Sequence, residues 1–485
     1  MHSERSFLLS SQPWLVVLIA AVSCLSASHG LAQDDRGPSG GDTAVIECDP
    51  IDWADTLGSG FSDDARGVAA YDFGGKARGE VYITGSFQGG GFNPAHFGAS
   101  TSNQIPNRFS HGGSRDVYVA KLDDCGRWLW VRTGGGFGAD AGEAVVVDSQ
   151  RNVIVVGTMD GTGSLDMEVG IPNSEPQFQQ GWGVSTVFAA KYNHQGVLQW
   201  FRTLGDGAAF DVDVDSNDDV ILTRTILSTG SGTNAGALIR LSGATGVAMP
   251  QQAFVAENLM LTGVSVGDQD RFCVVGNFKN TIQIGNQFTS AINGFPSVFV
   301  ALLDPSGAPH QIHVLTSSQG EVAANAAATT LRHETFVGGP GGSIYEWDCL
   351  AAGRFSGFLP VGIATLSSGF SADRDGWVAR FRWDEPDPIS ALHVGGSGHQ
   401  EVMDVALRDD ASGQMWITGF FNTEMLAWDA EQIHESLASW TTTLTAQSQR
   451  DAFLIGYGTA SGAWPTSFES AGNDEGRGIF VQPQS

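Results

Sequence analysis

The chain has 485 residues, a formal net charge of -28, 41% hydrophobic residues and only 16% charged side chains. This composition is sufficient for a packed core and excludes a disordered polyelectrolyte. The acidic balance repels phosphate backbones and anionic lipid surfaces, so we expect no nucleic-acid partner.

The first 32 residues have the pattern of a secretory signal peptide. An apolar run from Trp14 to Leu25 follows a basic residue and precedes small residues that suit cleavage before Gln33. The run is too short for a typical membrane span. We therefore expect export and no membrane span, with residues 33–43 as a flexible tail. Two alternatives stay open: an uncleaved anchor, and a lipid anchor at Cys24.

A strand-rich pattern then recurs about six times between residues 44 and 482. One copy reads Asp116-Val-Tyr-Val-Ala-Lys-Leu-Asp, followed by Gly126 and Trp130. The next copy reads Thr186-Val-Phe-Ala-Ala-Lys-Tyr-Asn, followed by Gly196 and Trp200. Weaker copies begin at Gly236, Ser297, Asp375 and Asp451. A fixed period of this kind indicates a repeat architecture.

Each repeat is predicted to contain four strands. The first is apolar and ends near an Asp, and a polar turn leads to the second. The second strand contains a glycine in a fixed slot, which predicts a bulge or a close backbone approach; these glycines are Gly85, Gly157, Gly276, Gly353 and Gly419. In the weakest repeat, residues 207–255, we place Thr223 in that slot. A variable insert precedes the third strand, and the fourth carries the Trp.

The expected fold is all-β, a single β-propeller of six or seven four-stranded blades. The first strands are almost continuously apolar, which indicates burial on both faces. The segment from Cys48 to Gly60 resembles a fourth strand, and the segment from Gly476 to Gln482 resembles a first strand. Strands from both termini are therefore expected to close the ring and cover its edge. Residues 483–485 form a short tail.

The complete repeat pattern is similar to the β-propeller repeats of bacterial secreted and cell-surface proteins. The resemblance covers roughly residues 44–482 and is strongest in residues 63–204. It implies a propeller fold and export. The family has no single activity and no shared catalytic residues, so the resemblance assigns none here.

Four cysteines follow the signal segment: Cys48, Cys125, Cys273 and Cys349. Export would permit disulfides. However, Cys273 and Cys349 hold the same slot in consecutive repeats, and equivalent positions in neighbouring blades usually lie too far apart to pair. We therefore favour free, buried thiols and leave pairing open.

The sequence predicts no catalytic, cofactor-binding or metal-binding residues. Asp213, Asp215, Asn217 and Asp219 have the alternate-position oxygens of a calcium loop, but the expected Gly and Glu are missing, so we favour an ordinary turn over calcium. His393 and His399 flank a glycine-rich segment that contains Ser397, without a nucleophile-elbow motif.

The leading functional prediction is a secreted or cell-surface binding or scaffold protein, acting as a monomer. Its partner would be an extracellular glycan or an envelope protein, bound through the variable loops. The alternative is a polysaccharide hydrolase or lyase with its site at the propeller axis. A third interpretation is a structural surface-layer component. We lean against an enzyme because no catalytic motif is present.

Overall fold

The structure is a computed structural model of the chain. It describes residues 5–11, 15–21, 53–59, 63–71, 79–90, 94–97, 105–110, 114–123, 126–160, 164–169, 178–180, 185–226, 233–291, 294–335, 344–362, 364–368, 373–407, 415–429, 443–446, 450–458, 462–468 and 474–480.

The described residues form an all-β protein built from antiparallel sheets, as expected. The described strands include six sets of four, here called units, and within each unit the strands pair in the order first, second, third, fourth. Unit 1 contains β4 (Asp64–Tyr71), β5 (Glu80–Phe87), β8 (Asp116–Asp123) and β9 (Trp128–Gly135). Unit 2 contains β10 (Ala141–Val147), β11 (Val153–Asp160), β14 (Ser185–Tyr192) and β15 (Leu198–Asp206).

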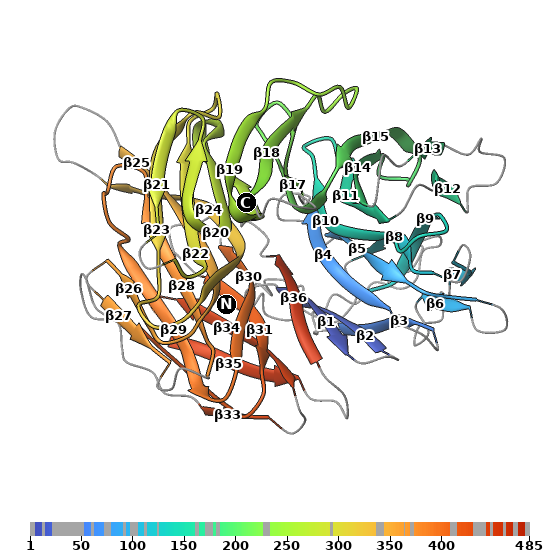
Figure 1. The fold of residues 1–485 in the computed structure, drawn as a ribbon. Coiled ribbons are helices and arrows are strands. Elements are labelled where there is room, and N and C mark those ends of the chain that lie inside the picture. Colours follow the sequence, from blue (N-terminus) through green and yellow to red (C-terminus); the bar gives the residue numbers. More distant parts are fainter. Residues whose placement is uncertain are drawn as a thin grey trace, which may run out of the picture.

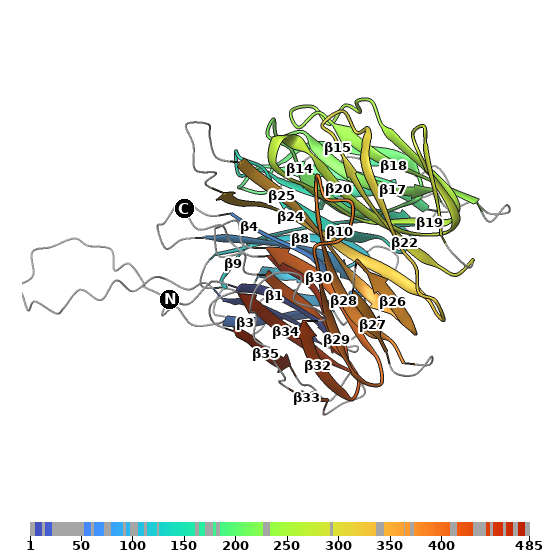
Figure 2. The ribbon, with the colours of Figure 1, turned by 90° about the vertical axis from the view of Figure 1, so that its left-hand side faces the viewer.

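The next two units share one long strand. Unit 3 contains β16 (Ala208–Val214), β17 (Val220–Ile226), β18 (Thr233–Leu241) and the first half of β19 (Gln252–Val266). Unit 4 contains the second half of β19, the first half of β20 (Phe272–Ile284), β22 (Ser297–Leu303) and β23 (Pro309–Leu315). A short 3-10 turn, η2 (Asp268–Asp270), joins β19 to β20. The sheets lie next to one another when viewed from the side (Figure 2).

Units 5 and 6 complete the regular series. Unit 5 contains β24 (Val322–Thr335), β25 (Ile344–Phe355), β28 (Asp375–Arg382) and β29 (Ser390–Ser397). Unit 6 contains β30 (Gln400–Leu407), β31 (Met415–Phe421), β34 (Asp451–Gly458) and β35 (Gly462–Phe468).

Strands from the two ends of the chain form one further sheet, the terminal sheet. Here β36 (Asp474–Phe480) pairs with β1 (Arg5–Ser11), which pairs in turn with β2 (Leu15–Ala21) and β3 (Trp53–Gly58). The strands β1 and β2 belong to the predicted signal segment, whose removal stays a prediction. Cleavage before Gln33 would leave β36 and β3 without the two strands that lie between them here.

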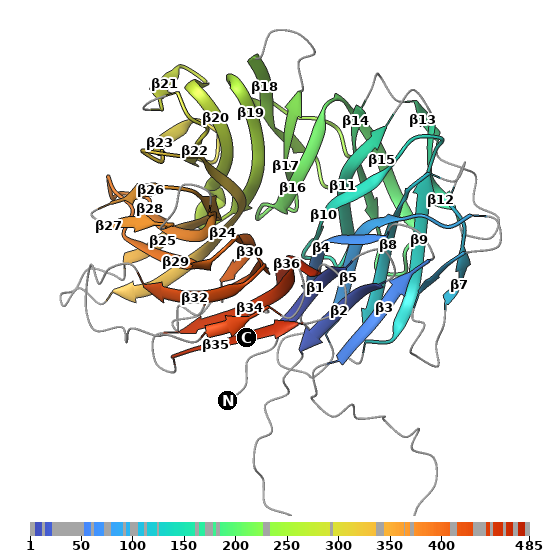
Figure 3. The ribbon, with the colours of Figure 1, turned by 60° about the horizontal axis from the view of Figure 1, so that its bottom comes forward.

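The sheets are arranged around a common centre as a β-propeller (Figures 1 and 3). The first strand of each sheet lies nearest this centre and contacts the first strand of the next sheet. Each hydrophobic cluster therefore lies between neighbouring sheets. One cluster joins Tyr82 and Trp130 of unit 1 to Val153 and Phe188 of unit 2. Along the first strands β4, β10 and β16, buried side chains alternate with half-buried ones, so the predicted burial of these strands on both faces is met only in part.

The inserts between second and third strands add strands to the outer edge of the preceding sheet. In this way β6 (Ala95–Phe97) pairs with β3, β12 (Ser164–Val169) with β9, and β32 (Glu424–Asp429) with β29. The second half of β20 pairs in the same way with β19. These four inserts cover edges that would otherwise expose unpaired backbone groups, whereas the insert of unit 5 forms a separate two-stranded sheet from β26 and β27. The remaining insert strands are β7 (Ile105–Arg108), β13 (Phe178–Gln180), β21 (Gln287–Ser290), β26 (Phe358–Val361), β27 (Ala364–Ser367) and β33 (Thr443–Thr445).

The glycine slot of the second strand lies opposite a bulge in the first strand. A Cβ atom on Gly157 would lie 2.1 Å from the carbonyl oxygen of Ala141, and one on Gly353 would lie 2.0 Å from that of Ala323. The predicted close approach is confirmed. In unit 3, the residue before the bulge of the first strand is Ala209, and it pairs with Arg224. Arg224 therefore occupies the slot, and the prediction of Thr223 is wrong by one residue.

The repeated Lys and Trp residues connect one unit to the next. Lys121 Nζ and Trp130 Nε1 both donate to the carbonyl oxygen of His194, each at 3.1 Å. In the following unit, Lys191 Nζ and Trp200 Nε1 both donate to the carbonyl oxygen of Gly243. The repeated Lys and Trp residues therefore form contacts between units.

Cys273 and Cys349 form a disulfide, with 5.9 Å between their Cα atoms. The preference for free thiols is wrong for this pair. Cys273 of β20 and Cys349 of β25 both belong to the buried cluster between units 4 and 5. Their separation is one that a disulfide can bridge. Cys48 and Cys125 lie outside the described residues.

Candidate binding face

The antiparallel order of strands divides the connections between two faces of the ring. Hairpins from first to second strand and from third to fourth strand lie on one side, which we call the turn face. Inserts from second to third strand, and connections from each fourth strand to the next unit, lie on the other, which we call the loop face. The Lys and Trp contacts are at the turn face. The loop face carries the segments that differ most between units.

An Arg-Asp doublet marks the start of the third strand in three units. It comprises Arg115-Asp116 in unit 1, Arg374-Asp375 in unit 5 and Arg450-Asp451 in unit 6. The three Asp side chains are buried, whereas Arg374 and Arg115 have side-chain exposures of 46% and 39%. The doublet thus fixes an arginine at the loop face, above a buried carboxylate.

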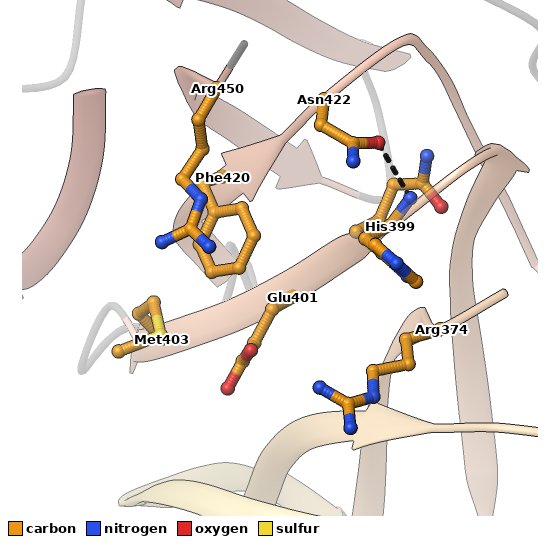
Figure 4. Close-up of a pocket in the computed structure, with 8 residues that line it drawn as sticks. Arg374, His399, Glu401, Met403, Phe420, Asn422 and Arg450 are labelled. Carbon is orange, nitrogen blue, oxygen red and sulfur yellow. Dashed lines mark hydrogen bonds between the residues drawn. The ribbon is translucent and has the colours of Figure 1, made fainter. Parts of the chain in front are cut away.

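Two of these arginines line a pocket of about 230 Å³ at the junction of units 5 and 6 (Figure 4). Unit 5 contributes Arg374. Unit 6 contributes the beginning of β30, the end of β31 and the residue before β34, which together supply His399, Gln400, Glu401, Met403, Phe420, Asn422 and Arg450. Figure 4 shows the side chains of Arg374, Glu401 and Arg450 around a common open space.

Backbone contacts hold this pocket in place. The amide of Gln400 donates to the carbonyl oxygen of Arg374 at 2.7 Å, which ties unit 6 to unit 5. The amide of His399 donates to Asn422 Oδ1 at 2.7 Å, and the amide of Asn422 donates to the carbonyl oxygen of His399. The guanidinium of Arg450 lies 4.2 Å from the centre of the Phe420 ring. The polar lining is therefore positioned by the strands rather than by loops alone.

The pocket lining has more cationic than anionic side chains. Among the lining residues that the structure describes, the one carboxylate is that of Glu401, which accepts from Arg354 Nη1 at 2.5 Å and from Asn325 Nδ2 at 2.9 Å. Outside the lining, Glu321 is 2.8 Å from Arg374 and 3.7 Å from Arg354. Arg374 is therefore paired with Glu321, and Glu401 is paired with Arg354.

A second pocket, of about 290 Å³, occupies the equivalent place between units 1 and 2. It has two arginines, Arg66 and Arg115, but three carboxylates, Asp140, Glu143 and Asp160. Arg66 pairs with Glu143 and with Asp64, and Arg115 is 3.5 Å from Asp64. Burial raises the pKa of Asp140 to about 7. Both pockets therefore contain arginines that are paired with carboxylates, and the described lining of this second pocket contains more carboxylates than that of the first.

Exposed aromatic side chains also gather on the loop face. Five large aromatic residues of the described chain with substantial exposure lie in inserts or unit-to-unit connections. Four are Phe109 (53%), Phe137 (88%), Phe295 (40%) and Phe358 (42%); the fifth, Phe288 (66%), lies in β21, whose Gln287 donates to the carbonyl oxygen of Pro309 at the turn face. Exposed aromatic rings provide flat apolar surfaces against which the apolar face of a ligand can pack.

The histidines of the glycine-rich segment are separated by the structure. His393 Nε2 is 2.6 Å from Asp375 Oδ2 inside unit 5, and both side chains are almost fully buried. Ser397 lies four residues further along β29, about 13 Å away at the usual rise of a strand. His399 instead lines the pocket. These residues therefore do not form a Ser-His-Asp arrangement.

The acidic run of unit 3 forms the predicted turn. Asp215 Oδ1 accepts from the amides of Asn217 and Asp219, and Arg240 lies at the carboxylates of Asp215 and Asp219. Asp213 is directed elsewhere, because its Oδ2 accepts from the amide of Val266 in unit 4. The turn is confirmed, and the four predicted oxygens do not converge. Among the residues that the structure describes, no group of three His, Cys, Asp or Glu side chains has the arrangement of a metal site.

Asp211 and Asp404 are the acidic residues that the first strands place near the axis. They hold equivalent positions beside the bulges of units 3 and 6. Asp211 accepts from the amide of Val264 and Asp404 from that of Ile479, so each carboxylate bridges to the next first strand. Burial is the main cause that raises the pKa of both carboxyl groups, and it raises the pKa of Asp404 to about 7. The nearby charge of Asp404 raises the pKa of Asp211 further.

Comparisons with known proteins leave the family open. No family model and no curated protein matches the chain. One solved structure, described as "Structure of Dos1 propeller", is similar over 86% of this chain and 84% of its own length, at 8% sequence identity and a TM-score of 0.34. A similarity at this level assigns no activity. No helix in the described part of the chain is long and apolar enough to cross a membrane.

Proposed function

We propose that the chain is a secreted or cell-surface β-propeller of seven blades that binds an extracellular polysaccharide through its loop face. In this proposal the six units are six blades, and β3 and β36, the terminal strands that remain after cleavage before Gln33, supply a seventh, partial blade that closes the ring. Export is supported by the predicted signal segment and by the disulfide between Cys273 and Cys349, since disulfides form in oxidising compartments.

The observation that carries the binding proposal is the pocket at the junction of units 5 and 6. Its volume of about 230 Å³ is below the roughly 300–1,000 Å³ of typical small-molecule sites. It therefore suits one part of a larger ligand that continues across the face. The exposed phenylalanines at the same face supply apolar surface for the remainder of such a ligand.

A polysaccharide hydrolase or lyase is the alternative, and Asp211 and Asp404 are the residues that favour it. Raised carboxyl pKa values near an axis are a feature of catalytic acids. However, both carboxylates accept backbone N–H groups of the neighbouring first strand, which gives each a structural role. The binding function is therefore the better supported of the two.

The test is to express the full chain in an exporting bacterium and incubate the secreted protein with neutral and acidic polysaccharides. Retention of protein and formation of new reducing ends are measured together. We expect retention without new ends, and mass spectrometry should give Gln33 as the first residue. New ends would establish the enzyme instead. Absence of retention, with self-association at low concentration, would favour a structural component.

A further inference from the structure

We propose that the pocket at the junction of units 5 and 6 binds one uncharged monosaccharide within the polysaccharide chain. This inference rests on the proposed binding function and specifies the class of its ligand. Its basis is a comparison of this pocket with the one between units 1 and 2, together with the ion pairs around the lining.

The two pockets are built from equivalent positions of the repeat. The amide of Gln400 donates to the carbonyl oxygen of Arg374, and in the same way the amide of Asp140 donates to that of Arg115. The strand registers extend this equivalence to further lining residues; the pairs are Glu401 and Ala141, Met403 and Glu143, Phe420 and Thr158, and Asn422 and Asp160. The two pockets therefore share one backbone framework and differ in their side chains.

Uncharged side chains at the junction of units 5 and 6 replace carboxylates of the other pocket. This holds at three equivalent positions; the pairs are Asp140 and Gln400, Glu143 and Met403, and Asp160 and Asn422. In the opposite sense, Glu401 replaces Ala141, but its carboxylate is paired with Arg354 at 2.5 Å. The lining thus offers amide and thioether groups where its counterpart offers charges.

Ion pairs within the protein already engage charged groups on both sides of the pocket. Arg374 of unit 5 is 2.8 Å from Glu321, and Glu401 of unit 6 is paired with Arg354. A charged ligand group would compete with these pairs. Hydroxyl groups can share them instead, because a guanidinium has five N–H donors, a carboxylate has about four acceptor sites, and a hydroxyl both donates and accepts.

Asn422 supplies an uncharged donor at the rim of the pocket. Its Oδ1 accepts from the amide of His399 at 2.7 Å, and Figure 4 shows this contact beside the open space. The contact fixes the orientation of the side-chain amide, so that Nδ2 is the atom that can donate to a sugar hydroxyl. Met403 lies in the same lining and supplies apolar contact for the CH groups of a sugar ring.

The overall charge of the protein favours the same class of ligand. A chain with a net charge of -28 repels an acidic polymer at long range. An uncharged polysaccharide meets no such repulsion. Its affinity is therefore also expected to be insensitive to salt, since screening acts only between charges.

The experiment measures the affinity of the full-length exported protein for galactomannan, xyloglucan and dextran, which are uncharged. The matched ligands are the same three polymers after carboxymethylation. We expect at least one uncharged polymer to bind, and its carboxymethylated form to bind at least fivefold more weakly. The affinity for the uncharged polymer should change less than twofold between about 50 mM and about 500 mM sodium chloride.

Two substitutions locate the site, and a third is the control. N422D keeps the oxygen that accepts from the His399 amide but removes the Nδ2 donor, so we expect binding about tenfold weaker. M403A removes the apolar contact and is expected to weaken binding about fivefold. D160N makes the reverse change at the equivalent position of the other pocket, and we expect a change below twofold.

Three outcomes would overturn the inference and leave the binding function intact. Tighter binding of the carboxymethylated polymers, or an affinity that falls more than tenfold at the higher salt, would show that a charged group is recognised. Unchanged binding by both N422D and M403A would place the sugar elsewhere. Equal weakening by D160N and N422D would remove the distinction between the two junctions. Failure to bind any of the six polymers would instead refute the proposed function itself. Unchanged thermal unfolding of each variant ensures that the losses report on binding.

Discussion

Trp130 of unit 1 donates its indole N–H to the carbonyl oxygen of His194 in unit 2, at 3.1 Å. Lys121 donates to the same oxygen, and Gly196 of that turn packs against the indole ring. One short turn of unit 2 is thus held by two side chains of unit 1. The same arrangement recurs between Trp200 and Gly243. The repeated Lys and Trp residues are therefore contacts by which units 1 and 2 each hold the unit that follows.

Replacement of Trp130 is expected to destabilise the junction between units 1 and 2. Trp130→Phe removes one hydrogen bond and is expected to cost about 1 kcal/mol. Trp130→Ala also removes the buried ring and is expected to cost about 3–5 kcal/mol. Leu129→Ala is the matched control, because the neighbouring Leu129 side chain is 47% exposed and should change stability by less than about 0.5 kcal/mol. Chemical denaturation measures all three, and equal effects of Leu129→Ala and Trp130→Ala would contradict the account.

The glycine slot is expected to be intolerant of any side chain. In Gly157→Ala, the new Cβ would lie 2.1 Å from the carbonyl oxygen of Ala141, so two backbone segments must separate. We expect a marked fall in the melting temperature or failure to accumulate folded protein. Gly90→Ala is the control, since no heavy atom lies within 4 Å of its added Cβ. A Gly157→Ala protein with the melting temperature of the parent would show that no bulge lies opposite this glycine.

The disulfide between Cys273 and Cys349 is expected to stabilise units 4 and 5. It closes a segment of 76 residues, for which loop-closure entropy gives about 4–5 kcal/mol in the chain-entropy model. Reductant should therefore lower the melting temperature of the parent protein. The double substitution Cys273→Ser with Cys349→Ser should melt at that lower temperature and be insensitive to reductant. Mass spectrometry of a non-reduced digest should contain the linked peptide pair; its absence in exported protein would disprove the bond.

The buried carboxylates are expected to make the protein more stable at mildly acidic pH. Burial raises the pKa of Asp140 and of Asp404 to about 7, from 3.8. The folded state thus binds more protons than the unfolded state between these values, so this stabilisation is present near pH 4 and is lost as the pH rises through about 7. We expect a melting temperature several degrees higher at pH 5 than at pH 8.

Asp404→Asn separates this effect from general charge repulsion. The amide oxygen can still accept from the backbone N–H of Ile479, but the group no longer titrates. The variant should lose part of the difference between pH 5 and pH 8. An unchanged pH dependence would show that Asp404 titrates normally in the folded state.

The sequence predicts the residues that repeat, because equivalent contacts at each junction require equivalent side chains. The glycine slots, the Lys and Trp positions and the turn at Asp215 are all recognisable in this way. The register at Thr223 was misplaced because that unit has Arg224 in the slot where the others have glycine. The disulfide was missed because the separation of neighbouring units depends on how closely their faces pack, which the sequence pattern does not specify.

The pocket could not be predicted, because its residues come from segments without a repeated pattern and from two units. Arg374 and Arg450 are separated by one complete repeat and meet only through the ring geometry. One usable signal was present. The Arg-Asp doublets at Arg115, Arg374 and Arg450 recur at the start of the third strand and indicate arginines at one face. Their distinct roles depend on the acidic neighbours, which differ between the two junctions.

The most direct test of the central claim is amide hydrogen exchange of the exported protein with and without a polysaccharide that retains it. Binding at the loop face predicts slower exchange in the segments 373–376, 399–403 and 420–423, which surround the pocket. The turn-face segments 193–197 and 243–247, held by Trp130 and Trp200, should be unchanged. Protection confined to the turn face, or none at a polysaccharide concentration that saturates retention, would contradict a binding site at the loop face.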